Sequence, residues 1–144
     1  HAVLARDSET PVTWRTDSKC KVASGRWTCP YTGRVITDPS EIDIDHLVAL
    51  KEAFASATGP RDAQGLPWTR DRRKEYANDL ANDYHLLATY SSANRSKGAR
   101  HPGQWMPDKG RCEYIRRRHK VKKAWQLAYS KSEVEAIRKE KCFK

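Results

Sequence analysis

Long hydrophobic runs are missing from this 144-residue sequence. No stretch approaches the roughly 18 consecutive apolar residues that a membrane-spanning helix needs, which excludes a transmembrane segment. No Cys-x-x-Cys pair occurs, which disfavours a zinc knuckle. No signal peptide is visible in the sequence, and a start at His1 is what we expect of a processed or trimmed chain. Methionine and phenylalanine are scarce, but five Trp and six Tyr supply large apolar side chains for the core of one folded domain.

Positively charged residues outnumber negatively charged ones in this sequence. The chain carries 28 Lys and Arg against 18 Asp and Glu, for a net charge of +10. Such a surface favours polyanionic partners, of which nucleic acid is the commonest, although a basic surface can also serve solubility. The densest basic run spans residues 116–123. From the sequence, this run is either a phosphate contact or an ordinary solvated surface.

Four cysteines are present, as a near pair and a distant pair. The simplest arrangement is two disulfides, Cys20–Cys29 and Cys112–Cys142, although four cysteines allow three pairings. Disulfides form in oxidising compartments, so this arrangement predicts a secreted or periplasmic protein. The alternative is four unpaired cysteines in the core.

The pattern of apolar residues, turns and caps predicts an α+β fold with no linker or repeat that would divide the chain. Residues 1–19 read as polar and irregular. The expected elements are, in order, a hairpin or two short strands within 20–37, a strand at 41–46, helices at 47–57 and 69–82, a strand at 84–89, a short helix within 91–98, and helices over 112–129 and 131–142. Thr69 is the expected N-cap of the second helix, and Gly98 ends the short one.

The segment Glu-Ile-Asp-Ile-Asp-His, residues 41–46, alternates acidic and apolar residues before the pattern turns fully apolar. Alternation with a period of two is typical of a half-buried strand. Asp45 and His46 are neighbours and therefore point to opposite faces, so they can converge only where the strand bends or ends. The change of pattern at Leu47 is consistent with such an end.

Three short stretches together carry a resemblance: Asp-His before Leu-Val-Ala-Leu, His-Leu-Leu-Ala from His85, and Asn-Arg-Ser-Lys-Gly from Asn94. In this order they resemble the HNH endonuclease signature of the ββα-metal fold, and most closely secreted HNH nucleases related to the GmrSD C-terminal domain. The interval of nine residues from His85 to Asn94 matches that family. The resemblance covers residues 27–142 and implies one nuclease domain over 1–144. Its ββα core would span about 27–110, with a long inter-strand loop, and helices over 111–142 would pack on it.

The resemblance also implies roles for these residues. His46 would be the general base that activates water, for which a neutral imidazole is suited near neutral pH. Asp45 and Asn94 would hold one hard divalent ion, Mg²⁺ in the first place, with Mn²⁺ or another divalent ion as alternatives. His85 occupies a position that is usually Asn, where it would either pin the inter-strand loop or join the metal, and we favour the pin. Asp43 shares the face of Asp45 and is expected beside the metal ligands.

Basic residues near the motif are candidates for phosphate contacts: Arg95, Lys97, Arg72 and Arg73. The expected activity is metal-dependent, largely sequence-nonspecific hydrolysis of DNA, or of RNA as well, by a monomer. The sequence is silent on an inhibitor protein. Two alternatives remain: a non-catalytic nucleic-acid-binding module with the same fold, and a zinc site built from His46, His85 and a third histidine such as His101. The tryptophans Trp68, Trp105 and Trp125 are expected to pack the core.

Overall fold

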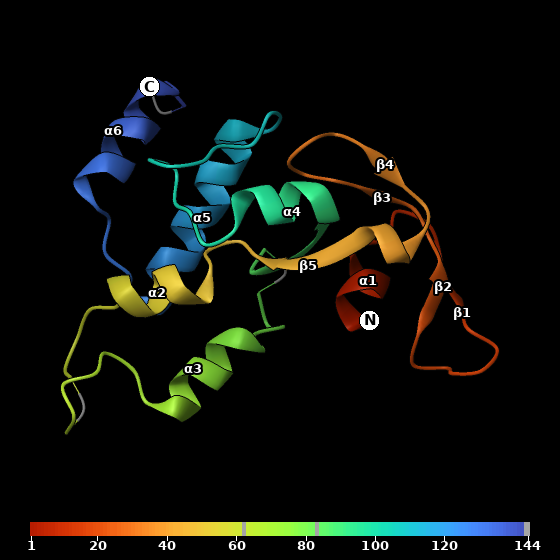
Figure 1. The fold of residues 1–144 in the computed structure, drawn as a ribbon, viewed down its shortest axis with the longest axis horizontal. Helices are drawn as coiled ribbons and strands as arrows, with labels where there is room; N and C mark the ends of the chain where they lie inside the picture. Colours follow the sequence, from red (N-terminus) through yellow and green to blue (C-terminus); the bar gives the residue numbers. More distant parts are fainter. Residues whose placement is uncertain (62, 83, 143–144) are drawn as a thin grey trace.

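A two-stranded antiparallel hairpin lies at the centre of the protein in a computed structural model that describes residues 1–61, 63–82 and 84–142 (Figure 1). Strand β5 (Ile42–His46) pairs with β6 (Leu86–Tyr90), in a register that runs from Ile42 opposite Tyr90 to His46 opposite Leu86. Helix α4 (Ser91–Lys97) follows β6 directly and packs on β5. The order strand, strand, helix is the ββα arrangement expected from the sequence, and the whole fold is α+β as predicted.

The long connection between the two strands of the hairpin carries helices α2 (Leu50–Ser56) and α3 (Arg70–Ala77). The expected N-cap of α3 is confirmed, because the Thr69 hydroxyl accepts a hydrogen bond from the amide of Arg72 at 3.1 Å. Both helices are shorter than predicted, since α2 begins only at Leu50 and α3 ends at Ala77. Residues 47–49 instead form an irregular turn between β5 and α2.

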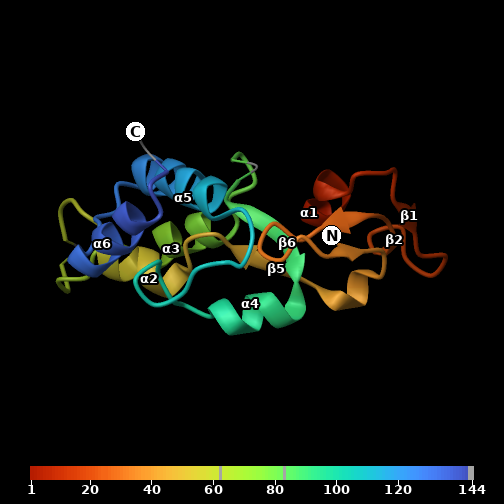
Figure 2. The ribbon, with the colours of Figure 1, turned by 90° about the horizontal axis from the view of Figure 1, so that it is seen from above.

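Two small hairpins precede the central one and lie at one end of the molecule (Figures 1 and 2). The first pairs β1 (Thr13–Trp14) with β2 (Val22–Ser24), the second pairs β3 (Trp27–Thr28) with β4 (Val35–Ile36), and the short 3₁₀ helix η1 (Pro39–Glu41) leads into β5.

Helix α1 (Ala2–Asp7) was not predicted, because residues 1–19 show no helical periodicity. Tertiary hydrogen bonds hold it in place: Asp7 accepts from the amide of Ala88 at 3.0 Å, and Arg6 donates to the carbonyl of Leu86. These side chains satisfy backbone groups along the outer edge of β6, which would otherwise be an unpaired strand edge.

The C-terminal third forms α5 (Arg111–Trp125) and α6 (Lys131–Lys139), as expected. Figure 2 shows α5 and α4 on opposite sides of the central hairpin. The predicted disulfide Cys112–Cys142 is present and joins the start of α5 to the segment after α6.

The second predicted disulfide, Cys20–Cys29, is wrong, since both cysteines are free. The sequence suggested a hairpin or two short strands across residues 20–37, but the chain reverses after β2 and places the two cysteines in different hairpins. Cys20 is exposed between β1 and β2. Cys29 is buried beside β6, and its sulfur accepts a hydrogen bond from the amide of Tyr90 at 3.3 Å.

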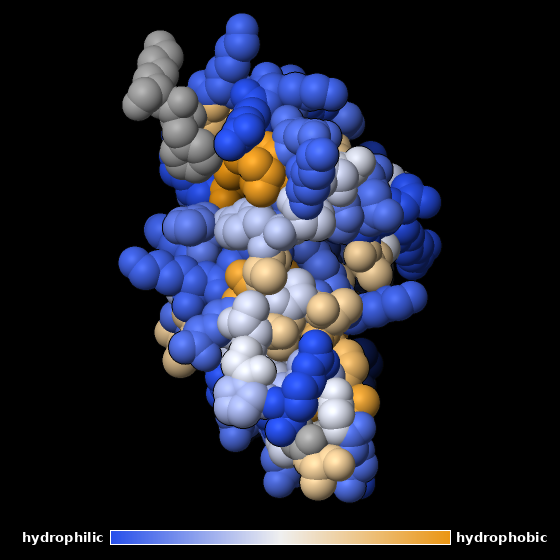
Figure 3. Space-filling model, turned by 90° about the vertical axis from the view of Figure 1, so that its left-hand side faces the viewer, coloured by the Kyte–Doolittle hydropathy of each residue, from blue (hydrophilic) through white to orange (hydrophobic). Residues whose placement is uncertain are grey.

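The main hydrophobic core lies between the central hairpin and the helices α2, α3 and α5. Trp68 is buried in it, and Trp105 and Trp125 pack against it, which confirms that these tryptophans are core residues. The face that presents α2, α3 and α6 is mostly hydrophilic, with small separate hydrophobic areas (Figure 3). No helix in the described part of the chain is long and apolar enough to cross a membrane.

Candidate active site

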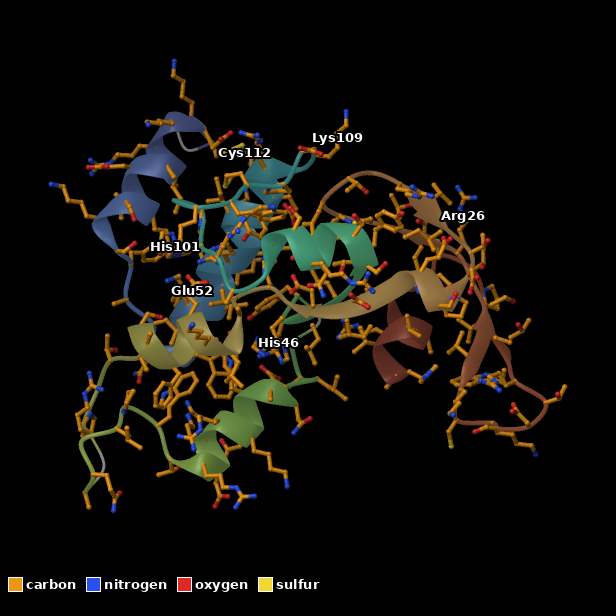
Figure 4. The ribbon with its side chains drawn as sticks, in the orientation of Figure 1. Arg26, His46, Glu52, His101, Lys109 and Cys112 are labelled. Carbon is orange, nitrogen blue, oxygen red and sulfur yellow. A yellow bond between two sulfur atoms is a disulfide. The ribbon has the colours of Figure 1, made fainter. Side chains whose placement is uncertain are left out.

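His46 is the last residue of β5, and its ring faces α3 (Figure 4). Its Nε2 lies 2.9 Å from the carbonyl oxygen of Ala77, and its ring packs nearly parallel to Tyr76, with 6.1 Å between ring centroids. A carbonyl oxygen can only accept, so Nε2 carries the hydrogen in this contact and Nδ1 is the basic nitrogen. The ring is half-buried, so water can still reach it.

Asp45 points to the other face of β5 and is only 6% exposed. Its carboxylate accepts from the hydroxyl of Tyr31 and forms an ion pair with the Lys97 ammonium at 3.2 Å. Burial raises the pKa of the Asp45 carboxyl, and the Lys97 ammonium opposes that rise. The structure therefore differs from the expectation that Asp45 presents a carboxylate to a metal ion, because a cation and a hydroxyl already occupy that carboxylate.

Asp43, and not Asp45, lies beside Asn94 in this structure. Its Oδ2 lies 3.3 Å from Nδ2 of Asn94, and both side chains are half-buried between β5 and α4. A carboxylate and a carboxamide side by side offer oxygen atoms that fit a hard divalent cation. Within the ranges that the structure describes, no group of three His, Cys, Asp or Glu side chains can hold a metal, so the zinc site considered from the sequence is not formed.

His85 lies just before β6 and is fully buried. Its Nε2 is 2.7 Å from the carbonyl oxygen of Tyr76, and its ring meets the Tyr76 ring edge-on at 4.4 Å between centroids. This contact joins the start of β6 to the end of α3 across the long connection, which is the geometry expected of a loop pin. Nδ1 of His85 has no hydrogen-bond partner among the described residues.

Burial lowers the pKa of His85 below its ordinary value of 6.5, so we expect the protein to be less stable in mild acid. As the pH falls through 6.5, the unfolded chain binds a proton that the folded chain refuses, so we expect the free energy of unfolding to fall between pH 7.5 and pH 5.5. Urea denaturation at both pH values measures this difference. A His85→Gln variant, which retains a donor for the Tyr76 carbonyl, should show a smaller decrease; an equal decrease would contradict the assignment.

Four basic residues were expected to contact phosphates, and the structure places them in different environments. Lys97 is fully buried against Asp45, so the expectation of a phosphate contact is wrong for this residue in the structure as it stands. Arg72 stacks on the ring of Trp125 at 4.2 Å, and Arg73 donates to the carbonyl of Trp68 at 3.0 Å. Arg95, next to Asn94 on α4, is exposed.

Side chains missed from the sequence complete the surroundings of His46 and Asp45. Tyr31, from the segment after β3, and Tyr76, from α3, are both buried and bonded to this region. Neither lies in the motif, and an aromatic residue far from it in the sequence gives no signal of that role.

Two comparisons with known proteins, one with family models and one with curated proteins, each gave a match. A family model described as GmrSD restriction endonucleases, C-terminal domain, matches residues 1–140. A relative from Arthroderma benhamiae, named an uncharacterized secreted protein, is 34% identical over 137 residues, which is 94% of this chain and 62% of the relative. The chain thus spans less than two thirds of that relative's length. No solved structure matches the chain.

Proposed function

Because the chain belongs to the family of GmrSD restriction endonuclease C-terminal domains, we propose that it is a metal-dependent endonuclease that hydrolyses phosphodiester bonds with little sequence preference. The observation that carries the proposal is His46 at the end of a ββα hairpin, with Nε2 on a backbone carbonyl and Nδ1 left as the basic nitrogen.

In the proposed reaction, Nδ1 of His46 accepts a proton from the attacking water. The bond from Nε2 to the Ala77 carbonyl keeps the ring in one tautomer and stabilises the imidazolium that forms. The resulting hydroxide attacks phosphorus, and the P–O bond to the leaving oxygen breaks. Exposed Arg95 lies close enough in sequence to Asn94 to contact a neighbouring phosphate.

Asp43 and Asn94 would hold a divalent ion on the face of β5 opposite to the His46 ring, with Mg²⁺ as the ion that fits their oxygen donors best. When bound, such an ion supplies charge to offset the pentacovalent phosphate and the leaving oxygen. Asn94 keeps the role expected from the sequence, and Asp43 replaces Asp45, whose carboxylate is paired with Lys97.

The proposed substrate is DNA, with RNA as a second substrate, in an extracellular or periplasmic setting. The net charge of +10 favours a polyanion, and the Cys112–Cys142 disulfide is suited to an oxidising compartment. The name of the Arthroderma benhamiae relative, which calls that protein secreted, supports the same setting.

Metal removal tests the proposal. The protein is incubated with plasmid, single-stranded DNA and RNA in Mg²⁺, Mn²⁺, Zn²⁺ or EDTA, and the products are separated on a gel. We expect cleavage in Mg²⁺ or Mn²⁺, none in EDTA, and recovery when excess Mg²⁺ is added to the EDTA sample. Tight, salt-sensitive binding without product in every ion would instead favour a non-catalytic nucleic-acid-binding module.

A further inference from the structure

Three consecutive backbone carbonyls, in the turn that follows β5, each accept a hydrogen bond from a buried side chain. Lys97 donates to the carbonyl of His46 at 3.1 Å, Arg118 donates to that of Leu47 at 3.4 Å, and the hydroxyl of Tyr76 donates to that of Val48. We call the three donors Lys97, Arg118 and Tyr76 the carbonyl clamp.

The members of the carbonyl clamp come from three different helices: Lys97 from α4, Arg118 from α5 and Tyr76 from α3. Each is at most 1% exposed. Carbonyls in helices and strands are normally satisfied by backbone amides, and a buried carbonyl without a donor is costly. At these three carbonyls side chains take over that task, so three separate helices contribute to holding the backbone here.

Arg118 is itself held by a buried cluster of charges. Its guanidinium pairs with Glu52 of α2 and Glu133 of α6, and Lys122 pairs with the same two carboxylates, at 3.6 Å and 3.0 Å respectively. Two cations and two anions balance in this cluster, which joins α2, α5 and α6. Figure 4 shows Glu52 where α2 approaches α5. The C-terminal helices therefore reach the backbone next to His46 through the hydrogen bond that Arg118 donates.

We propose that the carbonyl clamp positions His46 for catalysis. The clamp fixes the backbone on the C-terminal side of His46, while the ring of Tyr76 packs on the imidazole and the Ala77 carbonyl holds Nε2. Lys97, Arg118 and Tyr76 are thus positioning residues, and α5 and α6 belong to the machinery that orients the base. This inference rests on the proposed role of His46.

The most selective test replaces Tyr76 with phenylalanine, which removes the hydroxyl on the Val48 carbonyl and keeps the ring. We expect kcat for DNA cleavage to fall about tenfold, with KM changed less than about twofold, because a base that is slightly misplaced slows chemistry and leaves substrate binding intact. The matched control is Tyr129→Phe, which removes a hydroxyl bonded to His119, away from the turn. That variant should keep the wild-type kcat.

A second readout does not depend on activity. The amide of Leu47 donates to the carbonyl of His85 at 3.0 Å, so its hydrogen exchange reports the opening of the turn. We expect about tenfold faster exchange at Leu47 in Tyr76→Phe, and also in Arg118→Lys, which keeps the positive charge between Glu52 and Glu133. Exchange should be unchanged in Tyr129→Phe.

Unchanged exchange in both clamp variants would overturn the carbonyl clamp. Faster exchange with an undiminished kcat in an active enzyme would overturn its catalytic role. If His46→Ala remained fully active, the proposed function would fail, and the exchange rates would still decide whether the clamp fixes the turn.

Discussion

The His46→Ala variant should lose about 10²- to 10⁴-fold in kcat, because the general base that deprotonates the attacking water is gone. The fold should survive, since among the described residues the half-buried ring makes one side-chain hydrogen bond, to the Ala77 carbonyl. Initial rates on supercoiled plasmid in Mg²⁺ measure the loss. Circular dichroism and a gel-shift titration with DNA check that folding and binding are retained.

His119 supplies the matched control for that experiment. It is an exposed histidine on α5 whose ring contacts Tyr129, and among the described residues it has no hydrogen bond or ring contact with the candidate site. His119→Ala removes the same chemical group and should cleave at the wild-type rate. A well-folded His46→Ala protein that cleaves as fast as His119→Ala would exclude His46 as the base.

The Lys97→Met variant should lose about 3–5 kcal/mol of the free energy of unfolding, because it leaves the Asp45 carboxylate buried without its cation. Urea denaturation at pH 7.5 measures the loss. The deficit should shrink as the pH falls, since burial already raises the pKa of Asp45 and a protonated carboxyl has no charge to bury.

The double variant Lys97→Met/Asp45→Asn provides the control. Replacing the carboxylate with a neutral amide removes the unpaired charge, so most of the lost stability should return. If the single variant is as stable as the wild type, or if the double variant is no more stable than the single one, the Lys97–Asp45 pair does not hold this site together.

Local patterns predicted the elements that surround the site. The alternation around Ile42 and Ile44 predicted β5, and the Thr69 cap predicted the start of α3. Helix α1 could not be predicted in this way, because what holds it are hydrogen bonds to β6 residues about 80 positions away. The same limit applies to Cys20 and Cys29, whose short separation suggested a bond that the reversal after β2 prevents.

The partners of the two acidic residues on β5 were within reach of the sequence. Asn94 and Lys97 are three positions apart on a helix and therefore share a face, just as Asp43 and Asp45 share a face of the strand. Packing α4 on β5 then sets Asn94 against Asp43 and Lys97 against Asp45. The sequence motif did not indicate these two pairs, because it treats the adjacent residues Asp45 and His46 as one functional unit. Tyr76 and Arg118 could not be foreseen, since only tertiary packing brings them to the turn.

The disulfide between Cys112 and Cys142 has a consequence for where the protein matures. It holds the segment after α6 to the start of α5, and α6 carries Glu133, which pairs with Arg118. That bond closes only in an oxidising compartment. A newly made chain in a reducing cytosol therefore lacks one support of the turn beside His46. The support that α6 gives to the turn beside His46 is therefore complete only where this disulfide has formed.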